Sequence, residues 1–369
     1  MPAGFRPGQS FKSIVLIVLT PTYATRMDEL RRVQKVGYNS LSVSIPKAYA
    51  KELKLVKGDS VVVRVEADGT LRLIPTTKAK GSGKATLRAE QAGGKEMLNK
   101  LIVGSYALGY DTIEVAAKQP LDQGTVDSIV GTIKRLRGME VVESDARHIV
   151  AQSFIDPTKF PVDSLVKRLQ ILVSQSLDYV MDALDLKQTG RLNEVSRVQE
   201  EIDELYWLIL RQLLVALNRR ELASEIGIES PLHATGDRVS AKTLDEIGDI
   251  IKDVAEELVR LRGQGTKMDP KVAESIRRLA AKAREAFNTT VESLLTTDIR
   301  LVDKSVALVE ETMRLEKEIT HQMLESGEYG YARVLVSQFV QLARYCNIII
   351  EIASHRLLRK TSRVATVQQ

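Results

Sequence analysis

The stretch LDEIGDIIKDVAEEL at residues 244–258 decides the fold class of most of this chain. Its apolar side chains recur at spacings of three and four, which places them on one face of an α-helix that packs against other helices. The residues of this face are Leu244, Ile247, Ile251, Val254 and Leu258. A second row with a spacing of four runs beside it and carries carboxylates: Asp245, Asp249 and Asp253.

The same periodicity extends over residues 161–360, which we interpret as a helical body. Asp269-Pro270 gives one of its helices an N-cap residue and a proline at the first helical position. We expect two three-helix repeats, at about 161–264 and 269–360. The six predicted helices are 162–186, 190–219, 239–263, 270–296, 299–326 and 329–360.

Length, charge and cysteine content limit the class of protein. With 369 residues the chain exceeds the usual size of a single core, so we expect several domains. Residues 1–100 carry 18 Lys and Arg against 8 Asp and Glu, whereas residues 101–369 carry 35 against 40. This split predicts a basic head that meets polyanions and an acidic body. Cys346 is the only cysteine, which excludes an intrachain disulfide and favours a cytoplasmic location.

Residues 27–75 have the pattern of a small β-rich domain, the head. The predicted elements are a strand at 41–45, a helix at 48–53 and strands at 61–66 and 70–75. Pro46 ends the first strand, and Asp68-Gly69 between the last two is a strong hairpin signal. About 45 residues form only a marginal core, so we expect this domain to dimerise.

Four segments of the head carry a family resemblance: Arg31-Arg32-Val33, Gly37, Ser44-Ile45-Pro46-Lys47 and Leu55-Val56-Lys57-Gly58-Asp59. Through them the head resembles the AbrB/SpoVT family of swapped-hairpin domains. The resemblance implies an interleaved homodimer that binds DNA through basic residues. The candidate DNA-binding residues are Arg31, Arg32, Lys35, Lys47 and Lys51. Tyr38-Asn39-Ser40 departs from the family pattern, and the alternative is a head that serves only for dimerisation.

Three segments outside these domains carry little fold signal. Residues 1–26 are interpreted as a disordered leader or a misassigned start, with a weak secretory signal as the alternative. Their apolar stretch at 14–19 is far shorter than the roughly 20 residues that cross a bilayer, so we expect no membrane insertion. Residues 76–95 are predicted to be a linker, because Gly, Lys and Ala dominate there. Residues 361–369 are interpreted as a tail.

The predicted linker contains Gly81-Ser82-Gly83-Lys84, which is an incomplete phosphate loop. A phosphate loop needs Ser or Thr after the lysine, and this chain has Ala85. Residues 96–160 follow as a small α/β module of the βαβ kind. Its predicted elements are helices at 97–108 and 124–137 and strands at 112–116 and 139–143. We expect a spacer or a second dimer surface there, with His148 as a structural histidine.

Two stretches of the body carry a second resemblance: RVQEEIDEL at 197–205 and KTLDEIGDI at 242–250. Through them residues 161–360 resemble the PhoU family, whose three-helix repeats carry a carboxylate-x-x-x-Asp motif for multinuclear metal binding. Asp245 and Asp249 match that motif. The resemblance implies divalent or iron-type metal ions in the first repeat, with Asp203 and Glu201 as further ligands. A solvated acidic helix face is the alternative.

The second repeat departs from the metal-binding pattern. Thr320, Ala343 and Asn347 stand where the first repeat has carboxylates, so we expect metal only in the first repeat. The whole chain is thus predicted to be multidomain and mainly α. It combines a swapped-hairpin β head, a small α/β module and a PhoU-like six-helix body.

The sequence lacks the catalytic Ser/His/Asp, zinc-binding and complete phosphate-loop signatures, so we expect no enzyme. The resemblances imply a regulator of phosphate uptake and homeostasis. Its implied partners are DNA and a phosphate transporter ATPase or a phosphate-signalling protein. One alternative is an interaction protein that docks on the ATPase of a phosphate ABC transporter and uses its head only to dimerise. Another is metal-dependent phosphate chemistry in the bundle.

Overall fold

The structure is a computed structural model in which the chain divides into two compact units, Met1–Gly81 and Ser82–Gln369. The described residues are 29–38, 40–52, 54–65, 69–75, 83–184, 190–266, 269–326 and 330–359. The predicted leader at 1–26, the tail at 361–369 and the first part of the predicted linker lie outside these residues.

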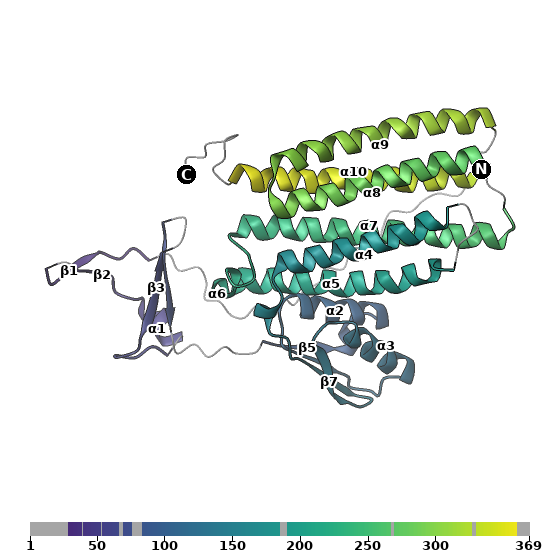
Figure 1. The fold of residues 1–369 in the computed structure, drawn as a ribbon. Coiled ribbons are helices and arrows are strands. Elements are labelled where there is room, and N and C mark those ends of the chain that lie inside the picture. Colours follow the sequence, from purple (N-terminus) through teal and green to yellow (C-terminus); the bar gives the residue numbers. More distant parts are fainter. Residues whose placement is uncertain are drawn as a thin grey trace, which may run out of the picture. The chain divides into compact units, whose positions relative to one another are not determined.

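Long helices make up the body, which confirms the mainly helical fold predicted from the sequence (Figure 1). α5 packs on α4 and α7, α8 packs on α9 and α10, and α10 also contacts α7, so the two sets of three helices join. One apolar core runs through both sets. The helices are α4 (Val162–Asp182), α5 (Leu192–Asn218), the short α6 (Arg220–Ala223), α7 (Pro231–Gly263), α8 (Pro270–Thr296), α9 (Ile299–Ser326) and α10 (Gly330–Arg359).

The start of α7 differs from the prediction, which placed it at residue 239. The helix begins at Pro231, and the Ser230 hydroxyl caps it by accepting a hydrogen bond from the His233 backbone N–H at 3.1 Å. The first turns of α7 bury His233, Ala234 and Asp237 in place of large aliphatic side chains. The apolar periodicity that predicted the helix is therefore missing from these turns.

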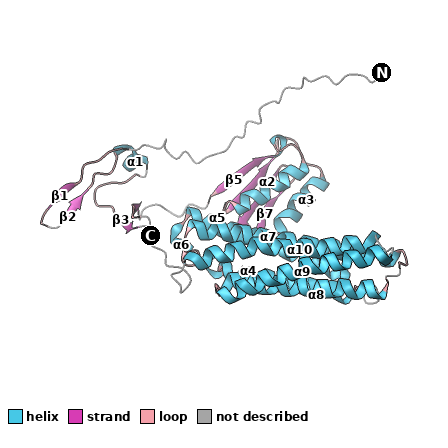
Figure 2. Ribbon diagram, turned by 90° about the horizontal axis from the view of Figure 1, so that it is seen from above, coloured by secondary structure: helices cyan, strands magenta, loops and turns pink. Residues whose placement is uncertain are grey.

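The α/β module precedes the body and forms a four-stranded sheet in the order β5-β6-β8-β7. β5 and β6 are parallel, whereas β8 is antiparallel to both β6 and β7. Helices α2 and α3 pack on one face of this sheet (Figure 2). The elements are β5 (Lys84–Arg88), α2 (Lys95–Ala107), β6 (Thr112–Ala116), α3 (Gln123–Lys134), β7 (Met139–Ser144) and β8 (His148–Ser153).

Two strands of the module were not predicted. β5 lies within the predicted linker at 76–95, and that prediction is wrong for residues 84–88, which pair with β6 in register. Lysine and glycine around β5 obscured a strand whose only apolar members are Ala85 and Leu87. β8 has alternating burial in the structure, but its sequence HIVAQS is short and has polar residues at both ends.

Buried polar side chains of α5 fix the module to the body. The Arg211 guanidinium, 2% exposed, donates hydrogen bonds to the carbonyl oxygens of Tyr106 at 2.7 Å and Tyr110 at 3.0 Å. It also contacts the Asp111 carboxylate at 2.6 Å. The neighbouring Gln212 amide donates to the carbonyl of Pro157 at 2.6 Å. These contacts join α5 to the end of α2 and to the turn at Pro157, and they hold the module on α5.

The head forms two antiparallel strand pairs and one short helix. β1 (Gln34–Val36) pairs with β2 (Ser40–Ser42), and β3 (Val61–Val65) pairs with β4 (Leu71–Pro75). α1 (Lys47–Glu52) lies between the two pairs in sequence. None of the head residues whose burial is described is buried, and large apolar side chains such as Leu41 and Val65 are 75% and 72% exposed.

Candidate functional site

The first candidate site is the acidic face that α5 and α7 form together. Gln199 on α5 donates from Nε2 to Asp203 Oδ1 at 2.9 Å and to Asp249 Oδ1 of α7 at 3.0 Å. One amide therefore joins two of the predicted ligands. Burial raises the pKa of Asp203, and the charge of Asp249 raises it further.

Gly248 leaves the space that the Gln199 side chain occupies. A Cβ at Gly248 would overlap Gln199 Oε1, so a side chain on this turn of α7 would displace the amide. Gln199 is 4% exposed, and its Oε1 has no hydrogen-bond partner among the described residues. The pattern of carboxylates in the sequence did not single out Gln199, because an amide is not part of the acidic row.

The other two predicted ligands have cationic partners of their own. Asp245 accepts a hydrogen bond from Lys242 Nζ at 2.8 Å, and burial raises the pKa of its carboxyl to about 6. Glu201 faces α4, where Arg168 Nη2 lies 3.7 Å from its Oε2. Within the described ranges, no three carboxylate, imidazole or thiol groups are arranged to hold a metal ion. The structure thus brings together Asp203 and Asp249, with Asp245 one turn away.

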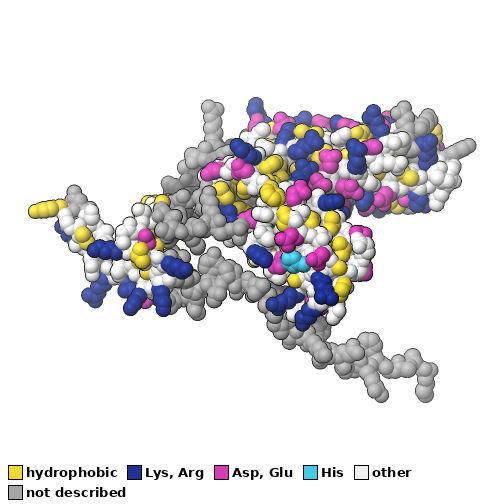
Figure 3. Space-filling model, turned by 90° about the horizontal axis from the view of Figure 1, so that it is seen from below, with side chains coloured by type: hydrophobic (Ala, Val, Ile, Leu, Met, Phe, Trp, Pro, Cys, Tyr) yellow, Lys and Arg dark blue, Asp and Glu magenta, His cyan; other side chains and the backbone are white. Residues whose placement is uncertain are grey.

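The five predicted DNA-binding residues lie in the head, and all are exposed. Lys35 is on β1, and Lys47 and Lys51 are one turn apart on α1. Arg31 is paired with Glu29 through an Nε to Oε2 hydrogen bond of 2.9 Å. Figure 3 shows Lys and Arg side chains gathered on one face of the head.

A third polar cluster lies on the sheet of the module. Glu114 on β6 accepts hydrogen bonds from Lys84 Nζ at 2.9 Å and Thr86 Oγ1 at 2.7 Å, both on β5. Its other oxygen lies 2.6 Å from His148 Nε2 on β8. Lys84, followed by His148, lowers the pKa of Glu114 to about 2.

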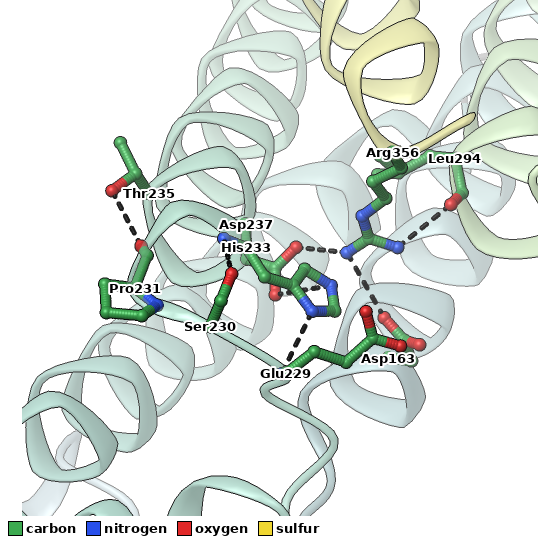
Figure 4. Close-up of polar contacts among 9 residues, drawn as sticks. All are labelled: Asp163, Glu229, Ser230, Pro231, His233, Thr235, Asp237, Leu294 and Arg356. Atoms are coloured by element: carbon green, nitrogen blue, oxygen red, sulfur yellow. Dashed lines mark hydrogen bonds and ion pairs between the residues drawn. The ribbon is translucent and has the colours of Figure 1, made fainter. Parts of the chain in front are cut away.

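A fourth cluster is buried at the end of the body and was not predicted from the sequence (Figure 4). Arg356 of α10 donates to Asp237 of α7, which is 1% exposed, and to the Leu294 carbonyl of α8 at 2.9 Å. Asp163 Oδ1 of α4 lies 3.5 Å from the same guanidinium. His233 Nε2 is 3.6 Å from Asp237 Oδ2, and burial lowers the pKa of His233. Four helices therefore meet at one ion pair.

The fold and these sites define a mainly helical, multidomain protein with an acidic face on its body and a basic β-rich head. Residues 166–258 match the family described as "PhoU domain". Residues 34–81 match the family described as "Antidote-toxin recognition MazE, bacterial antitoxin". These two matches confirm the PhoU resemblance over residues 166–258 and the resemblance of the head, as a MazE/AbrB-like domain, over residues 34–81.

Similarity beyond these two domains is limited. The crystal structure of PhoU from Pseudomonas aeruginosa is similar to this chain with 18% sequence identity and a TM-score of 0.42. The similarity covers 53% of this chain and 90% of that chain. No match to a curated protein was found. Every helix in the described part of the chain falls short of the apolar length that a bilayer crossing requires.

Proposed function

We propose that this chain is a cytoplasmic regulator of phosphate uptake and phosphate homeostasis that binds DNA through its head. The observation that carries the proposal is the combination of a PhoU domain at residues 166–258 and a MazE/AbrB-like domain at residues 34–81 in one chain. Both family descriptions favour a regulatory over a catalytic role. The body would then sense the phosphate state through a metal ion or a signalling partner, and the head would act on transcription.

The exposed surface of the head supports a homodimer that binds DNA. Leu41 and Val65 lie open to solvent, and a partner head that interleaves with the two strand pairs would bury such side chains. Lys35, Lys47 and Lys51 are free to neutralise backbone phosphates, contacts that give affinity without selecting a sequence.

A gel shift of the full chain on duplex DNA over a salt series tests this proposal. We expect a dimer whose affinity falls with salt, and each lost phosphate contact lowers the slope of log K against log salt by about 0.9. In the dimer the double variant K47E/K51E removes four phosphate contacts, so it should bind weakly and with a slope smaller by about 3.6. The matched control is R314E/K317E, which changes the net charge equally at exposed sites on α9. Equal binding by both double variants would contradict the proposal.

The acidic face supports a cation site of its own. Asp203 and Asp249 are like charges held close together, and a cation between them would remove their repulsion. A half-turn of the Gln199 amide would direct the unpartnered Oε1 at the same place, which adds a third oxygen ligand. Asp245, one turn away on α7, would be a further ligand. Glu201 would become a ligand only if its ion pair with Arg168 were broken.

Metal analysis of purified protein tests the cation site. Wild-type protein should carry a divalent or iron-type metal ion that Asp249→Asn loses. Asp253→Asn is the matched control, because Asp253 lies one turn further along the same row and is exposed. Equal metal content in the wild type and Asp249→Asn would exclude Asp249 as an essential ligand.

A second candidate function is an interaction protein that docks on a phosphate transporter ATPase and uses its head only to dimerise. The open apolar side chains of the head support the dimer on which this function depends, a dimer that the first proposal shares. The second function predicts a stable dimer that gives no gel shift even at low salt.

A further inference from the structure

A groove of about 300 Å³ lies at one end of the body, between the first turns of α7 and the last turns of α10. It is distinct from the acidic face and from the head. Because α7 belongs to one set of helices and α10 to the other, a molecule in this groove would contact both sets. A volume of this size is at the lower end of pockets that bind small molecules.

The side chains that line the groove change in character along its length. Val239, Ile348 and Ile352 line the half that lies toward the middle of the helices. Gly236 allows this close packing, since a Cβ there would lie 2.9 Å from the Ile352 side chain. This half is therefore narrow and mostly apolar, with Glu351 between Ile348 and Ile352 along α10 as its one carboxylate among the described lining residues.

The other half, at the end of the bundle, is basic. Leu232, His233, His355, Arg356 and Arg359 line it. Arg356 is already paired with Asp237, and burial lowers the pKa of His233 and keeps its ring neutral, so Arg359 and His355 are the groups that can face an anion. The N-terminus of α7 opens at the same end and adds partial positive charge. An acidic group is favoured here, and an apolar group is favoured deeper in the groove.

Two buried nitrogen atoms in the basic half have no hydrogen-bond partner among the described residues: Arg356 Nε and His233 Nε2. The two side chains are 9% and 8% exposed, so water reaches them poorly. His233 Nδ1 accepts a hydrogen bond from the Glu229 backbone N–H at 3.3 Å, which leaves the proton of the neutral ring on Nε2. His233 Nε2 faces the likewise unpartnered Asp237 Oδ2 at 3.6 Å, so Arg356 Nε is the donor in this half that lacks an acceptor. Burying this donor costs free energy unless an acceptor is supplied.

We infer that this groove binds a small amphipathic acid, with a carboxylate or phosphate group on an unbranched apolar chain. The acid group pairs with Arg359 and His355 and supplies an acceptor to Arg356 Nε. The chain lies along Val239, Ile348 and Ile352. The rise along α10 from Arg356 to Ile348 is about 12 Å, which suits a chain of about eight carbons.

Calorimetric titration of the full chain tests this inference with octanoate and octyl phosphate as probes. Acetate has the acid group without the chain, and 1-octanol has the chain without the charge. We expect at least one eight-carbon acid to bind more tightly than both controls and to raise the melting temperature, because a ligand that binds only the folded state stabilises it. Comparing the two acids assigns the head group.

Substitutions at the rim keep the test independent of folding. R359E should weaken binding of the eight-carbon acid about fivefold, as expected for an ion pair at a half-exposed site. R344E on the same helix is the matched control, since Arg344 is exposed and does not line the groove. V239E, which places a charge on the apolar wall, should weaken binding by more than about tenfold.

Three results would overturn the inference. One is that neither eight-carbon acid binds more tightly than acetate or 1-octanol. Another is equal binding by R359E and R344E. The third is association with vesicles of anionic phospholipid without binding of either free acid, which would assign the groove to a membrane surface.

Discussion

The buried ion pair between Arg356 and Asp237 allows a quantitative prediction. In the variant Arg356→Met the side chain at position 356 keeps a similar length but loses its charge. Asp237, which is 1% exposed, then has no arginine to pair with. His233 Nε2 lies 3.6 Å from Asp237 Oδ2, but burial lowers the pKa of His233 and disfavours the charged ring that could replace the arginine. Removing one partner of a buried pair typically costs about 3–5 kcal/mol of unfolding free energy. The hydrogen bond to the Leu294 carbonyl is lost as well.

Urea denaturation at pH 7 measures this loss through the midpoint and slope of the transition. The double variant Arg356→Met/Asp237→Leu should regain most of the stability, because apolar replacement of both partners removes the unpaired charge. Arg300→Met breaks an exposed pair with Asp298, where the arginine side chain is 87% exposed, and should leave the urea midpoint close to that of the wild type. If Arg356→Met lies within about 1 kcal/mol of the wild type, the buried ion pair is not formed as described.

Three further predictions concern the acidic face and the module. Gly248→Ala should destabilise the body, because overpacking against Gln199 costs about 1–3 kcal/mol and outweighs a gain in helix propensity of about 1 kcal/mol. In the control Gly131→Ala the added Cβ meets nothing within 4 Å, so this variant should stabilise the module. Chemical denaturation measures both changes. The pKa of Glu114 is lowered to about 2, so its stabilising effect is present above pH 4.5 and is lost as the pH falls toward 2. Unfolding of Glu114→Gln, followed by circular dichroism, should therefore depend less on pH over that range than unfolding of the wild type. The same pH profile in both proteins would contradict this prediction. Arg211→Met should release the module from α5 and raise amide hydrogen exchange around Tyr110 by at least about tenfold, with no change expected for Arg344→Met.

The helices of the body could be predicted because their buried faces are aliphatic and periodic. The stripe from Leu244 to Leu258 is buried as predicted. The prediction failed at the start of α7, where the buried positions include His233 and Asp237. Asp237 can be buried there because Arg356 of α10 pairs with its carboxylate. Periodicity in one segment carries no information about such a partner.

The candidate sites show the same limit. The acidic row of α7 was evident from the spacing of Asp245 and Asp249, but the structure gives these two carboxylates different partners. Which of them meets Asp203 depends on the packing of α5 against α7. The pair formed by Asp237 and Arg356 spans 119 positions, a separation at which no local pattern links two residues. Only the packed bundle brings them together.

The central claim is that one chain joins a PhoU domain to a DNA-binding head and acts on phosphate uptake. Genome-wide chromatin binding of the full chain in its native host, at low and at high phosphate, tests this most directly. We expect enrichment near promoters of phosphate-transport genes that changes with phosphate and is lost in K47E/K51E but not in R314E/K317E. No enrichment at either phosphate level, with the protein expressed, would contradict it.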